Sequence, residues 1–379
     1  MTEQAELTRD LLALTRELAD AELRPAVADA ERASAFPRGA FRVLGEAGLL
    51  GLPYPEAWGG GGQPYEVYLQ VVEELSRAWL AVGLGVSVHT LACFPIATAG
   101  TEGQRQRWLP GLLGGGLLGA YCLSEPHSGS DAAALTTRAE RDGDAYRLTG
   151  VKAWITHGGQ ADFYSVFART SGEPGRSRGI SCLHVPAGTP GVSAAAPEHK
   201  MGMRASATAQ MIFDNAPVPA DQLVGEEGQG FRIALAALDT GRLGIAACAT
   251  GLAQAALDCA VGYARERRQF GRPIAEFEGL AFLLADMATA VEAARALYRS
   301  AARRKDAGEP FGQQAAMAKL FASDTAMRVA TDAVQVLGGY GYVEDFPAER
   351  YLREAKVLQI VEGTNQIQRM VIGRSLAQG

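Results

Sequence analysis

Glu362 is the carboxylate whose surroundings most favour acid–base chemistry. It follows the apolar residues Ile360 and Val361 and precedes a predicted helix start at Gly363. A carboxylate in a dry pocket has its pKa raised toward the range useful for a general base. The alternative is a solvated glutamate near a helix N-terminus, where the helix dipole favours a negative charge. The position therefore predicts either a proton acceptor or a structural residue.

Two segments rich in small and hydroxyl residues could surround a planar ligand. Residues 121–131, YCLSEPHSGSD, leave a predicted strand and turn through small residues, so backbone N–H groups and hydroxyls can approach a ligand closely. Residues 152–159, KAWITHGG, place Trp154 and Thr156 where an indole could wall an aromatic cofactor and a hydroxyl could bond its heteroatoms. The alternatives are a turn capped by Asp131 and a tryptophan of the hydrophobic core.

Two further segments, each ending in glycine, could bind a pyrophosphate. Residues 263–271, YARERRQFG, form a basic helix end whose arginines could receive an anion. Cations there also complement the helix dipole, so a structural role is an equal alternative. Residues 335–341, QVLGGYG, run into glycines in a way that is more typical of a helix C-cap than of a phosphate cradle.

The predicted secondary structure that must position these residues changes along the chain. Residues 1–118 are predicted to form a helical domain, because leucines recur at near-helical spacing from Leu7 to Leu23. Residues 119–227 read as a small antiparallel β domain, with a hairpin turn at 142–144 between short alternating runs. Residues 228–379 return to long helices with alanine-rich interiors, at about 229–267, 276–306, 312–337 and 363–377. The predicted order is α, β, α.

Composition excludes several classes of protein. The 379 residues carry a net charge of -6, which argues against non-specific binding of nucleic acid. The five cysteines lack a C-x-x-C pair and the five histidines lack the spacing of metal ligands, so neither a disulfide framework nor a metal site is expected. Residues 79–101 are uncharged, but glycines, polar residues and Pro95 favour a buried helix over a membrane span. The charged N-terminus lacks a signal-peptide pattern, so a cytoplasmic protein is expected.

Seven segments, taken in order, resemble the acyl-CoA dehydrogenases over essentially the whole chain. They are YCLSEPHSGSD, KAWITHGG, KMGMRAS, LDTGRLGIAA, YARERRQFG, QVLGGYGY and QIVEGTNQIQR. The resemblance implies a helical N-terminal domain, an antiparallel β-barrel middle domain and a C-terminal four-helix bundle. It also implies FAD held between the subunits of a homotetramer that is a dimer of dimers.

The resemblance assigns roles to individual residues. The flavin would be lined by Tyr121, Leu123, Ser124, Ser130, Trp154, Ile155 and Thr156, with Thr156 near its reactive N5 edge. The adenosine and pyrophosphate end would be held from the neighbouring protomer by Arg267, Gln269, Phe270, Gln335, Val336, Gly338 and Gly339. Thr364 and Gln366 would complete the FAD site. The substrate would contact Ser130, Asp239, Arg242 and Gly363.

Glu362 matches the catalytic base of the family. The resemblance implies that it removes the α-proton of a bound acyl-CoA while flavin N5 accepts the β-hydride, giving a trans-2-enoyl-CoA. Some subfamilies place the base on an earlier helix, at the position that is Gly241 here, so Glu362 has no competitor. An electron-transferring flavoprotein is the expected acceptor. The segment around Asp239 resembles short-chain and short branched-chain members, which act in fatty acid or branched-chain amino acid catabolism.

Two kinds of alternative function stay open. A carrier-protein thioester could replace free CoA with identical chemistry. Flavin oxidase and monooxygenase relatives share the fold, although the glutamate at 362 favours a dehydrogenase. Three residues depart from the common pattern: Glu278 stands where glutamine is usual, and His127 and His157 stand where small residues and asparagine are frequent.

Overall fold

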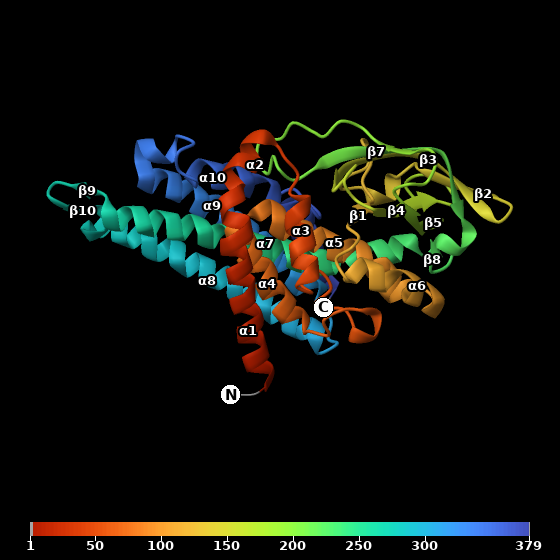
Figure 1. Ribbon diagram of the computed structural model, residues 1–379, viewed down its shortest axis with the longest axis horizontal. Helices are drawn as coiled ribbons and strands as arrows, with labels where there is room; N and C mark the ends of the chain where they lie inside the picture. Colours follow the sequence, from red (N-terminus) through yellow and green to blue (C-terminus); the bar gives the residue numbers. More distant parts are fainter. Residues whose placement is uncertain (1–2, 379) are drawn as a thin grey trace.

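The computed structural model describes residues 3–378, which form helices, then a sheet, then helices (Figure 1). The α, β, α order predicted from the sequence is therefore confirmed. The N-terminal helices are α1 (Glu3–Leu18), α2 (Val27–Ala33), α3 (Arg38–Glu46), α4 (Tyr65–Ala78), α5 (Leu80–Ala99) and α6 (Glu102–Leu113). α6 begins at a capping box, in which the Thr101 side chain accepts from the Gln104 N–H and the Gln104 side chain accepts from the Thr101 N–H.

The middle of the chain forms one eight-stranded sheet. Its strands are β1 (Gly119–Cys122), β2 (Arg138–Asp142), β3 (Ala145–Thr156), β4 (Phe163–Arg169), β5 (Ile180–Pro186), β6 (Val192–Ala194), β7 (Thr208–Pro219) and β8 (Leu223–Val224). Their order is β6-β7-β3-β2-β4-β5-β8, and β1 pairs with β4 beside this path. The predicted hairpin is confirmed, because Asp142 pairs with Ala145. The expectation of a purely antiparallel sheet is wrong: β1 and β2 both pair with β4 in parallel, since long connections separate these strands.

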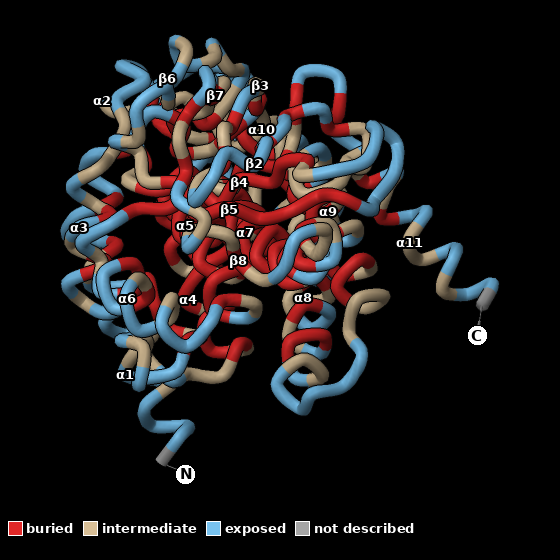
Figure 2. The backbone as a smooth tube through the Cα atoms, turned by 90° about the vertical axis from the view of Figure 1, so that its right-hand side faces the viewer, coloured by how far each residue is buried: buried red, intermediate tan, exposed pale blue. Residues whose placement is uncertain are grey.

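The C-terminal part consists of long helices that pack closely on the N-terminal ones. They are α7 (Gly230–Glu266), α8 (Glu278–Asp306), α9 (Gly312–Leu337), α10 (Ala348–Leu358) and α11 (Asn365–Gln378), with the hairpin β9 (Arg268–Gln269) and β10 (Arg272–Pro273) between α7 and α8. A Cβ added at Gly251 would lie 2.2 Å from the carbonyl oxygen of Glu73 on α4, so only glycine permits this approach. Figure 2 shows the buried residues concentrated where α4, α5, α7 and α9 meet the sheet, while α11 projects from the body.

Two helices are long and apolar enough to cross a membrane by length and composition alone. They are Leu80–Ala99 and Gly230–Glu266, and 94% and 78% of their most apolar windows are buried inside the protein. Burial of this kind is typical of core helices, as the sequence predicted for residues 79–101. The five cysteines are free thiols.

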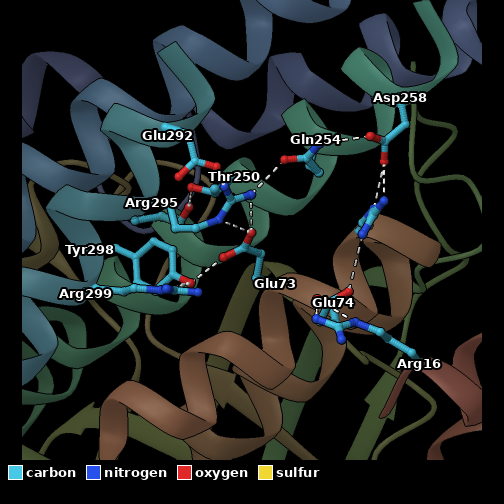
Figure 3. A network of polar contacts seen from close by, with 12 residues as sticks. Arg16, Glu73, Glu74, Thr250, Gln254, Asp258, Glu292, Arg295, Tyr298 and Arg299 are labelled. Carbon is cyan, nitrogen blue, oxygen red and sulfur yellow. Dashed lines mark hydrogen bonds and ion pairs between the residues drawn. The ribbon is translucent and has the colours of Figure 1, made fainter. Parts of the chain in front are cut away.

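A polar network on Glu73 joins the N-terminal helices to α7 and α8 (Figure 3). The Glu73 carboxylate accepts hydrogen bonds from Arg295 Nε at 2.7 Å and from the Tyr298 hydroxyl, and both residues lie on α8. Arg295 also donates to Gln254 on α7 at 2.8 Å. Glu73 is buried, so its charge is compensated by this arginine and not by water.

Replacing Glu73 with glutamine should lower the free energy of unfolding by about 3 kcal/mol, because it leaves the Arg295 guanidinium without its buried counter-charge. The same arginine pairs with Glu292, whose side chain is 69% exposed. Glu292→Gln is therefore the matched control and should cost less than about 1 kcal/mol. Urea unfolding of the two variants beside the wild type makes the comparison, and equal losses would contradict a structural role for the buried pair.

Candidate active site

A cavity of about 530 Å³ lies between α5, α7, the sheet and the segment after α10. The structure brings most of the predicted flavin and substrate residues together around it: Tyr121, Leu123, Ser124, Ser130, Trp154, Ile155, Thr156, Arg242, Glu362, Gly363 and Thr364. These residues come from four separate stretches of the chain. No single sequence motif predicted that these residues would line one cavity.

Glu362 lies in this cavity in a strained backbone conformation. Its φ of 52° is in the left-handed region, which costs energy for a residue with a Cβ and is common at functional sites. Both carboxylate oxygens are buried, and neither has a hydrogen-bond partner among the described residues. Burial raises the pKa of Glu362 to about 7, although Lys319 and Arg242 oppose the shift. The group can therefore both take up and release a proton near neutral pH.

Gly241 on α7 makes the room that this carboxylate needs. A Cβ at position 241 would lie 2.0 Å from Glu362 Oε2 and 3.3 Å from Leu91 Cδ1. Any other residue would have to displace the carboxylate. Gly241 is therefore the residue of α7 that leaves space for the Glu362 side chain.

The loop that carries Ser124 and Ser130 is held from behind by a buried ion pair. Lys152 Nζ donates to Glu125 Oε1 at 2.8 Å and to the Leu123 carbonyl at 3.0 Å. The Glu125 carboxylate also accepts from the backbone N–H groups of Thr136 and Thr137. Burial alone would raise the pKa of Glu125, but Lys152 and these hydrogen bonds outweigh it and lower the pKa to about 2. These contacts within the protein fix the loop.

Trp154 stands beside the cavity because β3 is irregular there. The register with β7 shifts between Lys152 and Ile155, and Trp154 has a φ of 62°. Trp154 is 64% exposed, which is unusual for a large apolar residue. The interpretation of Trp154 as a core tryptophan is wrong, because the bulge turns it out of the sheet's interior. Thr156 follows on the same cavity wall.

A second group of predicted residues lies away from this cavity. Arg267 ends α7, and Gln269 and Phe270 belong to the β9–β10 hairpin that follows, at the end of the molecule opposite the sheet (Figure 1). Gln335, Val336, Gly338 and Gly339 lie where α9 ends. The two sets meet through Arg267, whose guanidinium lies 5.7 Å from the centre of the Tyr340 ring. Phe270 is 94% exposed.

The remaining predicted residues lie near the cavity without all lining it. Asp239 pairs with Arg242 at 2.6 Å, and Arg242 but not Asp239 reaches the cavity wall. Thr364 and Gln366 share a neighbouring hollow of about 290 Å³.

The three residues that depart from the common pattern, His127, His157 and Glu278, do not line the cavity. His157 is buried outside the cavity wall, with Nδ1 2.9 Å from the Gly119 carbonyl oxygen, and burial lowers its pKa to about 4. His127 is exposed, 3.7 Å from Glu125. Glu278 is exposed at the start of α8, where the helix dipole favours an acid. No cluster of metal ligands occurs in the part of the chain that the structure describes.

Sequence reasoning missed the apolar wall and one buried lysine. The wall comes from α5 and α7 and includes Leu84, Val88, Leu91, Leu238 and Ile245. Ordinary leucine periodicity gives no sign that these side chains face a cavity. Lys319 did leave a signal, because it is a cation within an alanine-rich stretch of a long helix.

Three family models match the chain. They are the acyl-CoA dehydrogenase N-terminal domain at residues 5–116, the middle domain at 120–216 and the C-terminal domain at 228–377. An acyl-CoA dehydrogenase of Bacillus subtilis is 48% identical over 97% of both chains. The mitochondrial short-chain specific acyl-CoA dehydrogenase of Bos taurus is 45% identical over 95% of this chain and 88% of its own.

Solved structures agree with these matches. Butyryl-CoA dehydrogenase from Megasphaera elsdenii superposes with a TM-score of 0.96 and 41% identity, over 100% of this chain and 99% of its own. A chain from work on the electron-transferring flavoprotein of Acidaminococcus fermentans gives 0.96 and 45%, with the same coverage. The prolyl acyl carrier protein oxidase AnaB gives 0.92 and 30%, over 99% of both chains. The chain therefore belongs to the acyl-CoA dehydrogenase family.

Proposed function

We propose that this FAD-dependent enzyme converts a short-chain acyl-CoA to the trans-2-enoyl-CoA, with Glu362 as the base that removes the α-proton. The observation that carries the assignment of the base is the pair of buried, unpartnered carboxylate oxygens of Glu362 beside the cavity. A buried acid without a hydrogen-bond partner is costly, so it is retained where its reactivity is used. The short-chain and butyryl relatives support the substrate class.

The residues of this chain prepare the proton transfer in three ways. The leucines and isoleucine of α5 and α7 exclude water from the acyl chain, which strengthens the electrostatic interactions inside the cavity. Arg242 and its partner Asp239 would meet the CoA part of the substrate. The backbone N–H of Glu362 would bind the thioester carbonyl, so that the charge developing on its oxygen is stabilised and the α-carbon becomes more acidic. Glu362 then accepts the α-proton.

The residues around the cavity fit a flavin. Ser124, Ser130 and Thr156 supply hydroxyls, and Trp154 supplies an exposed aromatic surface beside them. When bound, FAD supplies the acceptor for the hydride of the β-carbon. The proposed contacts of Thr364 and Gln366 extend this site to the neighbouring hollow.

The distal residues lead us to propose a homotetramer, a dimer of dimers. Arg267, Gln269, Phe270 and the 335–339 segment would hold the adenosine and pyrophosphate end of FAD bound to a neighbouring protomer. This explains why Phe270 is so exposed in a single chain. We further propose the domain boundaries 1–118, 119–227 and 228–379, a middle sheet closed as a barrel and a C-terminal four-helix bundle.

We also propose partners and a setting. An electron-transferring flavoprotein would reoxidise the enzyme in the cytoplasm, within fatty acid or branched-chain amino acid catabolism. A carrier-protein thioester is the second candidate substrate, because the structural similarity to a prolyl acyl carrier protein oxidase extends over nearly the whole chain.

Anaerobic addition of butyryl-CoA should bleach the oxidised flavin absorbance of the purified enzyme within one turnover, and octanoyl-CoA should do so more slowly. The reason is the limited volume of the cavity, about 530 Å³, and the apolar wall that α5 and α7 form on one side of it. Isobutyryl- and 2-methylbutyryl-CoA test branching in the same assay. If the flavin stays oxidised with every CoA ester but is bleached by a butyryl-carrier protein, the second candidate substrate replaces the first.

A further inference from the structure

Lys319 is a buried lysine directly beneath the segment that carries Glu362. It lies on α9 and is 0% exposed. Its Nζ donates to the Gly363 carbonyl at 3.0 Å and to Asn365 Oδ1 at 2.8 Å. Both acceptors are neutral, so these bonds orient the ammonium group without neutralising its charge.

The same two acceptors are held by other residues of the region. Gln368 Nε2 donates to the Gly363 carbonyl at 2.8 Å. Asn365 Nδ2 donates to Asp324 Oδ1 at 2.7 Å, and the Ser323 hydroxyl lies 3.1 Å from Asn365 Oδ1. The peptide that follows Glu362 is thus anchored at several points. Loss of one of them would not release the segment. The other groups that hold these two acceptors, Gln368 and Ser323, are neutral, so only Lys319 brings a positive charge to this set of contacts.

The buried ammonium and the buried carboxylate influence each other's protonation. Burial lowers the pKa of Lys319 to about 8, while the charges of Glu362 and Asp324 oppose that shift. Lys319 is the strongest influence that lowers the pKa of Glu362, followed by Arg242. The other titratable groups that sense Glu362 are Tyr65 and Tyr68 on α4, Tyr121 on β1 and Cys248 on α7. Burial raises the pKa of each of these four groups. Among the described residues, the cations whose charge lowers the pKa of Glu362 are Lys319 and Arg242.

We infer that Lys319 is a positioning residue for the reaction, which fixes the peptide after Glu362 and holds Glu362 in its carboxylate form. This rests on the proposed role of Glu362 as the base. Lys319 does not touch the reacting atoms. Its positive charge favours the state of Glu362 that can accept a proton, because a neighbouring opposite charge stabilises the ionised acid. The low-polarity surroundings strengthen that attraction.

A purely structural lysine would behave differently from a positioning one. Loss of a structural lysine lowers stability and reduces turnover equally at every pH. Loss of the proposed influence leaves more Glu362 protonated at low pH, so the enzyme loses activity there and recovers it at high pH. The pH profile of turnover separates the two roles.

The experiment compares Lys319→Met, Lys319→Gln and Lys319→Arg holoenzymes with the wild type, using butyryl-CoA from pH 5.5 to 9. The acidic limb of kcat should move upward by on the order of 1 pH unit in the methionine and glutamine variants. At pH 6 this is a loss of roughly tenfold relative to the wild type at the same pH. Lys319→Arg should keep the wild-type limb. KM should change less than kcat, because Lys319 lies beneath the base and not among the residues that line the cavity.

Lys200→Met is the matched control. Lys200 Nζ also donates to a backbone carbonyl, that of Ser206 at 2.7 Å, but it does not line the cavity. Its loss should leave the acidic limb in place. If Lys319→Met does not fold, Lys319→Gln decides, since glutamine retains an amide donor without the charge. A limb that stays at the wild-type pH in a folded, uncharged variant overturns the inference. If Glu362→Gln keeps its turnover, the proposed base fails first, and that result is distinct from an unmoved limb in the lysine variants.

Discussion

Glu362→Gln is expected to lower turnover of butyryl-CoA by at least ~100-fold, because glutamine cannot accept the α-proton and positioned general bases contribute at least that much. Glutamine has nearly the same shape, so FAD binding and substrate binding should persist. Single-turnover bleaching of the flavin measures the chemical step directly. Glu292→Gln, an exposed substitution of the same kind, should leave the rate unchanged. Retention of more than about a tenth of the wild-type rate would remove Glu362 from the role of base.

The same substitution should stabilise the protein above neutral pH. Burial raises the pKa of Glu362 from 4.5 to about 7, so between these values the folded protein binds more protons than the unfolded chain. Stability contributed by this group is therefore lost as the pH rises through that window. Glutamine never ionises, so Glu362→Gln should unfold at a higher temperature than the wild type at pH 8 and at a similar temperature at pH 4.5. The active-site acid is thus kept at the expense of stability.

Gly241→Ala is expected to lower turnover by on the order of 100-fold while leaving the fold intact. The new methyl group would lie 2.0 Å from Glu362 Oε2, and the carboxylate, as the flexible end of a side chain, must move to avoid it. A displacement of about 1 Å at a reacting group can cost ~100-fold in rate. Because the group that yields is a side chain and not backbone, thermal unfolding should change little.

Gly262→Ala is the matched control for this prediction. Gly262 lies on the same helix, α7, and a Cβ there would meet nothing within 4 Å. Alanine is a better helix former than glycine, so this variant should be as active as the wild type and slightly more stable. Wild-type turnover in both alanine variants would show that Gly241 does not set the position of the base.

Local patterns predicted most of the elements. Alanine-rich periodicity predicted residues 312–337, and α9 has these bounds. The turn at 142–144 predicted the β2–β3 hairpin. α10 was missed, although Tyr351, Ala355 and Leu358 recur at helical spacing, because the helix is short and follows a glycine-rich stretch. The parallel pairing of β1 with β4 could not be predicted, since it depends on which distant strands become neighbours.

The residues around the cavity were predictable only in part. The hydroxyls of Ser124 and Thr156 and the carboxylate of Glu362 could be found from their sequence motifs, and the structure brings them together. The left-handed conformation of Trp154 could not, because it follows from a bulge against β7. The space opposite Gly241 depends on how closely α7 approaches the loop after α10. Such distances are set by tertiary packing. A glycine in the sequence indicates only that another group can approach the backbone closely.

α7 has a consequence for mixtures of defective chains. It carries Arg242 at one cavity and ends beside Arg267 at the proposed contact with another protomer's FAD, roughly 36 Å further along its axis. In the proposed tetramer each chain would therefore contribute to two flavin sites through one continuous helix. In a mixed pair, a subunit altered only at Glu362 would damage its own site, and a subunit altered only at Arg267 would damage that same site, which is its partner's. Assembled together, they would still form a fraction of complete sites by complementation. In such a site one chain would provide the base and the other would provide the contacts to the adenosine and pyrophosphate end of FAD.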